Sequence, residues 1–123
     1  MTAIDPAILQ RLRDEWEHHR TLQARALFDE VATLFAHIEQ EIAPIEVVVF
    51  NVGANVRFDI ADTTERVYRK VWEAGALAGF LVGREAARVM EPRGRGSIFF
   101  TGATASLRGG AGFCAFAGAK HAL

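Results

Sequence analysis

A near-continuous run of β-branched and aromatic residues, Ile45-Glu46-Val47-Val48-Val49-Phe50, constrains the fold of this chain more than any other feature. A short apolar run bounded by turn residues predicts a strand that is covered on both faces, as in a parallel sheet packed between helices. Ser97-Ile98-Phe99-Phe100-Thr101 is a second run of the same kind. The two runs predict two buried strands at the centre of an α/β fold.

The residues before the first strand predict one long helix. Asp5-Pro6 supplies an N-cap followed by proline, and Ala43-Pro44 stops the helix after Ile42. In its second half, apolar residues recur at three- and four-residue steps and predict one buried stripe. The stripe consists of Leu27, Val31, Leu34, Phe35, Ile38 and Ile42.

Two further helices follow the strands. Asp62 and Glu65 have the spacing of a capping box and predict the start of a long helix over residues 62–90, which Pro92 and the glycines after it end. A glycine- and alanine-rich loop over residues 102–112 leads into a last helix that begins near Phe113. The order is therefore helix–strand–helix–strand–helix.

Composition narrows the possible partners and compartments. With 14 basic and 15 acidic residues the net charge is −1, which predicts no nucleic-acid partner. No apolar run approaches the length of a membrane span, so no membrane partner is expected either. Cys114 is the only cysteine, and the start MTAIDPAILQ lacks the apolar stretch of a signal peptide. These features predict a cytoplasmic protein.

Three segments resemble, in order, the short-chain dehydrogenase/reductases. Residues 47–54 are similar to that family's fourth strand and its Asn-Asn-Ala-Gly turn. Residues 71–81, from Val-Trp-Glu to Gly-Phe-Leu, resemble its central helix. Residues 97–106 and 116–120 resemble its catalytic-serine strand and its Tyr-x-x-x-Lys helix. The order and spacing of the segments carry the resemblance.

The resemblance implies a partial Rossmann-like, doubly wound parallel sheet. It covers residues 27–123, as the central part of an NAD(P)-binding domain, and leaves residues 1–26 as an N-terminal helical segment without a match. The family's glycine-rich pyrophosphate loop has no counterpart before Phe28. A rival placement of that loop at residues 101–108 fails at its second and third glycines. Two strands also leave both sheet edges unpaired, which predicts a fragment or a chain that needs a partner.

The resemblance implies four catalytic positions, of which one is matched. In the family, tyrosine transfers the proton, lysine holds the nicotinamide ribose, serine orients the carbonyl and asparagine supports a relay water. Lys120 matches the lysine, while Phe116, Ala103 and Gly75 occupy the tyrosine, serine and asparagine positions. An alignment shifted by one residue would make Thr104 a substitute for the serine.

No other residue restores the missing chemistry. Tyr68 is the only tyrosine, and it lies far from the expected position, so a partly exposed helix residue is the plainer interpretation. Glu15, His18 and His19 could share a helix face, but no third convergent ligand is apparent and no metal site is expected. Cys114 is interpreted as a small core residue.

The resemblance also implies a cofactor, NAD or NADP. By position, the residues expected to contact it are Asn51, Val52, Gly53, Ala54, Thr101 and Lys120. Without the pyrophosphate loop, we expect the chain alone to bind either dinucleotide only weakly.

These observations favour an oxidoreductase relative that has little or no activity of its own. One alternative is a non-catalytic binding module that forms a homo-oligomer through the helices at 62–90 and 113–123. The other is a truncated product without a function of its own.

Overall fold

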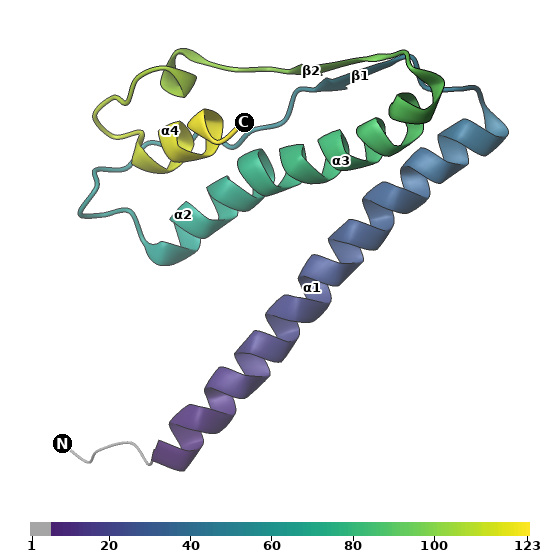
Figure 1. Cartoon of the computed structure of the whole chain (residues 1–123). Helices are drawn as coiled ribbons and strands as arrows, with labels where there is room; N and C mark the ends of the chain where they lie inside the picture. The colour runs from purple at the N-terminus through teal and green to yellow at the C-terminus, as the bar shows by residue number, and fades with distance from the viewer. Residues whose placement is uncertain (1–5) are drawn as a thin grey trace.

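The computed structural model describes residues 6–123, and for residues 8, 9, 12, 16, 17 and 19–27 it describes the backbone alone. Figure 1 shows a long helix, a strand pair and a set of shorter helices beside that pair. The elements in chain order are α1 (Pro6–Glu41), β1 (Val47–Phe50), α2 (Glu65–Trp72), the π-helix η1 (Glu73–Leu77), α3 (Ala78–Met90), the 3-10 helix η2 (Glu91–Arg93), β2 (Ser97–Phe100), the 3-10 helix η3 (Thr104–Ser106) and α4 (Cys114–His121). The predicted order is confirmed.

The two strands pair in parallel. Val47 lies opposite Ser97 and Phe50 opposite Phe100, so the two strands begin and end together. A parallel pair requires a crossover connection, and α2, η1 and α3 supply it. The α/β arrangement predicted from the two apolar runs is therefore present as a partial Rossmann-like fold.

The apolar core lies between the strands and the helices on one side of them. Phe35 of α1 packs with Ala86 and Met90 of α3, and Val48 and Ile98 of the strands pack against this group. In Figure 1 the helices lie on one side of the strand pair. Because alternate strand residues point to opposite faces, only half of each strand is used in this core.

The opposite face of the strand pair is open, so the expectation of strands covered on both faces is wrong for the described residues. Val47 and Val49 of β1 are exposed, as is Phe99 of β2, which is 56% exposed. These three residues point away from the helices, and no described element packs on them. A continuous apolar run allows a strand to be buried on both faces. Whether both faces are buried also depends on elements elsewhere in the chain.

Two details of the helices differ from expectation. The crossover helix begins at Glu65 with Thr64 as its N-cap, whose Oγ1 accepts a hydrogen bond from the Val67 amide at 3.3 Å. Asp62 lies two residues before this cap, in a preceding turn in which its amide donates to the carbonyl of Asp59. The helix is also interrupted by η1, which no feature of the sequence indicated.

The predicted stripe on α1 is only partly buried. Phe35 is buried and Val31 and Ile38 are half-buried, but Leu34 and Ile42 are exposed. The side chain of Leu27 lies outside the described residues. Among the described elements α1 packs against α3, and the members of the stripe that do not face α3 remain exposed. In the described part of the chain no helix is long and apolar enough to cross a membrane.

Candidate functional site

The carboxyl ends of the two strands meet at one edge of the sheet. β1 ends at Phe50 and is followed by the turn 51–54, while β2 ends at Phe100 and is followed by Thr101. The Thr101 amide donates to the Phe50 carbonyl at 2.9 Å, which extends the pairing past the last strand residue. This edge is where ligands bind in open α/β sheets.

Lys120 of α4 reaches this edge and joins the two segments. Its side chain is buried, and Nζ donates to the carbonyl of Thr101 at 2.6 Å and to the carbonyl of Val52 at 3.2 Å. No carboxylate pairs with it in the described part of the chain. An ammonium group has three donors, so two carbonyls leave one donor for another partner. The structure thus brings together three segments that the sequence proposed as cofactor contacts.

Gly53 permits this approach. A Cβ at this position would lie 3.1 Å from Lys120 Cε and 3.4 Å from Nζ, closer than almost all real contacts of this kind. The other members of the turn 51–54 differ in their exposure to solvent. Asn51 and Val52 are exposed, whereas Ala54 packs against the buried residues Val71, Ala115 and Ala119. Ala54 therefore serves packing in the described structure, and its role toward a cofactor stays a prediction.

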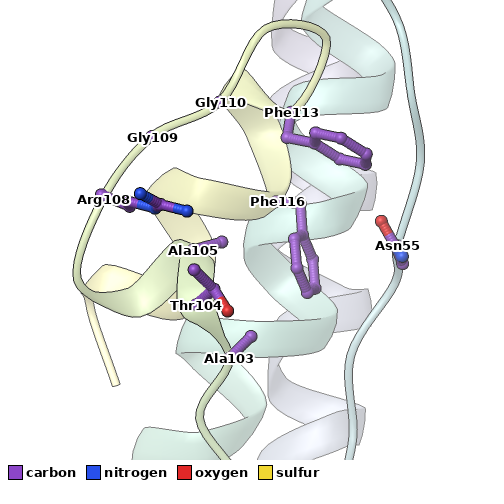
Figure 2. A pocket seen from close by; sticks show the side chains of 9 residues that line it. All are labelled: Asn55, Ala103, Thr104, Ala105, Arg108, Gly109, Gly110, Phe113 and Phe116. Carbon is purple, nitrogen blue, oxygen red and sulfur yellow. The ribbon is translucent and has the colours of Figure 1, made fainter.

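A pocket of about 480 Å³ lies between the loop after β2 and α4, the helix that also carries Lys120. Figure 2 shows Ala103 and Thr104 on one side of it, with the rings of Phe113 and Phe116 across from them. Its walls are formed by Asn55, Ala103, Thr104, Ala105, Arg108, Gly109, Gly110, Phe113 and Phe116. The volume is in the range of small-molecule sites.

Two of the proposed catalytic positions, Ala103 and Phe116, line this pocket, as does the alternative Thr104. Ser106 does not, because its Oγ accepts a hydrogen bond from the Ala103 amide at 3.0 Å and closes a short turn. The two side chains at the serine and tyrosine positions therefore present only carbon atoms to the pocket.

Gly75 lies apart from the pocket walls. It is buried in the π-helical segment η1, and a Cβ there would lie 3.0 Å from the Cβ of Ala119 on α4. π-helical turns are rare in proteins, and those that occur are often found at functional sites. Here the absence of a side chain lets two helices approach, so a larger residue such as asparagine at this position would press on Ala119.

Tyr68 does not supply the missing hydroxyl. Its ring is 45% exposed on α2, and its hydroxyl oxygen lies 3.0 Å from where a Cβ of Gly118 would stand. Neither residue lines the pocket. Cys114 is half-buried and its Sγ lies 3.3 Å from Thr63 Oγ1, while His121 Nδ1 bonds the carbonyl of Ser106 instead of the thiol.

Sequence reasoning missed three pocket residues: Asn55, Arg108 and Phe113. Arg108 stands within the glycine-rich loop that the sequence did indicate, and Phe113 begins the helix after it. Asn55 follows the turn directly. These three residues meet at the pocket only because of how the loop 102–112 packs beside α4. A local sequence pattern does not predict that packing.

A family model, curated relatives and solved structures all match this chain to the same family. Residues 8–123 match the family model described as short chain dehydrogenase. The match includes part of the segment 1–26, and the domain boundary at residue 27 stays a prediction. Zerumbone synthase of Zingiber zerumbet is 31% identical over 97 residues, which are 77% of this chain and 36% of that protein.

Solved structures agree with this match. A short-chain dehydrogenase from Rhodopseudomonas palustris is 61% identical with a TM-score of 0.73, over 78% of this chain and 45% of that one. A putative gluconate dehydrogenase from Agrobacterium tumefaciens is 26% identical with a TM-score of 0.74, over 77% and 38%. The chain thus spans less than half the length of each of these proteins.

Proposed function

The chain belongs to the short-chain dehydrogenase/reductase family, and from that premise we propose that it is an oxidoreductase relative with little or no catalytic activity of its own. The observation that carries the proposal is Phe116. It lies one helical turn before Lys120, in the wall of the pocket, at the position where the family's proton donor is expected. A phenyl ring has no proton to give.

Among the described residues, the pocket walls offer no substitute acid. Reduction of a carbonyl needs a proton at the oxygen as hydride arrives at the carbon. The polar side chains on the walls are the amide of Asn55, the hydroxyl of Thr104 and the guanidinium of Arg108. An amide and an aliphatic hydroxyl do not ionise near neutral pH, and a guanidinium stays charged in proteins. We therefore propose that a ligand in this pocket is held without being reduced.

The cofactor expected from the family, NAD or NADP, would supply the hydride, and part of this chain fits it. The unused donor of the Lys120 ammonium and the exposed turn 51–53 suit the hydroxyls of a nicotinamide ribose. The pyrophosphate has no matching loop within these 123 residues, whose first glycine is Gly53. The chain alone would hold one end of the dinucleotide.

We expect that NAD and NADP do not bind the 123-residue chain with micromolar affinity. Isothermal titration with each dinucleotide measures this, and nicotinamide absorbance against a panel of ketones and alcohols measures turnover. A competent dehydrogenase, assayed in parallel, shows that the conditions are adequate. Micromolar binding of either cofactor would refute the expectation for binding, and turnover above the no-enzyme blank would refute the proposed lack of activity.

A second candidate function is association with another copy of the chain. Three aromatic side chains are exposed on the crossover helices: Tyr68, Trp72 and Phe80, the last of them 59% exposed. Exposed apolar patches mark interaction sites, and we propose such a role for these side chains. We propose that residues 62–90 and 113–123 form a homo-oligomer interface. We also propose a cytoplasmic location, because Cys114 is the single cysteine and a chain without disulfides suits a reducing compartment.

Light scattering at tens of micromolar tests self-association. We expect a dimer or larger species for the unmodified chain, because the aromatic side chains on α2 and α3 and the open sheet face remain uncovered. Trp72→Glu should lower the associated fraction, whereas Leu107→Glu, at an exposed loop position, serves as the matched control. A stable monomer of the unmodified chain would contradict this candidate.

A further inference from the structure

The pocket between the loop after β2 and α4 has apolar walls and a positively charged rim. Phe113, Phe116 and the alanines at 103 and 105 supply its apolar walls. Among the described residues, Arg108 is the only charged one that lines it, and no acidic one does. A ligand that fits must therefore present an apolar body, and a negative group would be favoured on the side of the arginine.

Arg108 is available for such a group. Within the described part of the chain it has no ion pair and no hydrogen bond from its side chain. Figure 2 shows its side chain turning inward from the outer loop, toward the wall that carries Phe113 and Phe116. The glycines at 109 and 110 follow it and leave that side of the pocket without bulky side chains.

A second arginine adds to the positive charge on this side. The guanidinium of Arg57 lies 5.7 Å from the centre of the Phe113 ring, on which it stacks as a cation–π pair. Its stem lies against Gly112, where a Cβ would be 3.0 Å from Arg57 Cγ. Among the described residues Arg57 has no carboxylate partner either. The Phe113 side of the pocket is therefore bordered by two cations without counter-charges.

We infer that this pocket binds organic carboxylates with an aromatic or aliphatic body, and that Arg108 is the residue that selects the carboxylate. A guanidinium can donate two parallel hydrogen bonds to a carboxylate, which makes the pair specific as well as favourable. The apolar body would lie against Phe113 and Phe116. The inference rests on the proposed function, because it treats the pocket as one that holds a ligand without reducing it.

A matched pair of probes tests the inference. Phenylbutyrate and phenylbutanol share an apolar body and differ in the carboxylate, and neither contains a reducible carbonyl. By isothermal titration at low salt and without a cofactor, we expect the carboxylate to bind at least about tenfold more tightly. In Arg108→Gln the two probes should bind about equally, while Arg66→Gln, which removes an exposed arginine on α2, should keep the preference.

The results decide between clear alternatives. Equal affinity of the two probes for the unmodified chain would overturn the inference, as would no binding of either or a preference that survives in Arg108→Gln. Circular dichroism of each variant confirms that its fold is retained. Because the titration involves neither nicotinamide nor a carbonyl, its failure would leave the proposed lack of hydride transfer untouched, and turnover in the absorbance assay would refute the proposed function independently.

Discussion

Arg93→Ala is expected to lower the free energy of unfolding by about 2 to 4 kcal/mol, since it breaks a partly buried, hydrogen-bonded ion pair between distant segments. Arg93 Nη1 donates to both carboxylate oxygens of Glu39, at 2.9 and 3.2 Å, and Nη2 donates to the carbonyl of Ile45. The same Glu39 accepts a hydrogen bond from the Ile45 amide at 2.6 Å. The cluster ties the end of α1 and the entry to β1 to the residues before β2.

The matched control for this variant is Arg95→Ala. Arg95 pairs with Glu46 at 3.0 Å, but the two side chains are 69% and 48% exposed, compared with 25% and 22% for Arg93 and Glu39. An exposed pair contributes less than about 1 kcal/mol. Urea unfolding followed by circular dichroism measures both variants. Equal losses would show that the Arg93 cluster does not hold α1 to the strands.

Leu81→Ala is expected to cost about 2 to 5 kcal/mol, because removing a buried leucine side chain leaves a cavity. Leu81 of α3 is fully buried, at 0% exposure. α3 packs against both strands, so a loss here would also loosen the edge where the turn 51–54 and Thr101 meet. The control is Leu107→Ala, at 90% exposure, with an expected change below about 0.5 kcal/mol. A shift in the urea midpoint no larger than that of the control would contradict the buried role of Leu81.

The sequence was sufficient to predict the order of elements and much of the candidate site. Local signals account for this success: a β-branched run marks each strand, and Pro92 followed by Gly94, with its φ of 63°, ends the crossover helix as expected. The resemblance to the Tyr-x-x-x-Lys helix implied that Lys120 would contact a cofactor together with the turn 51–54 and Thr101. The structure places its ammonium group against the carbonyls of Val52 and Thr101.

The features that the sequence did not predict depend on contacts between distant residues. The ion pair of Arg93 and Glu39 joins positions 54 residues apart. Whether a strand face is covered depends on elements packed across it, so the exposure of Val49 could not be inferred from its own run. The arrival of Arg108 at the pocket likewise depends on how the loop 102–112 folds. Periodicity and spacing describe one segment at a time, whereas each of these features depends on how several segments pack together.

Hydride transfer by variants with restored hydroxyls tests the proposed function most directly. Phe116→Tyr returns a proton donor beside Lys120, Ala103→Ser returns a hydroxyl to the pocket, and Gly75→Asn returns the relay position. Such groups typically contribute about two to four orders of magnitude each. They act only on an oriented nicotinamide, however, and positioning can supply about 7 to 11 kcal/mol of a barrier.

Because asparagine at position 75 would crowd Ala119, the double variant F116Y/A103S should be measured beside the triple variant and the unmodified chain. The measurement is nicotinamide absorbance with NAD and NADP against a panel of ketones and alcohols. We predict no change above the no-enzyme blank for any of the three proteins, since these 123 residues contain no glycine-rich loop matching the one expected to hold the pyrophosphate. Cofactor-dependent turnover by the unmodified chain would contradict the proposed absence of a proton donor, and turnover by either variant alone would show that the chain positions the cofactor without a pyrophosphate loop.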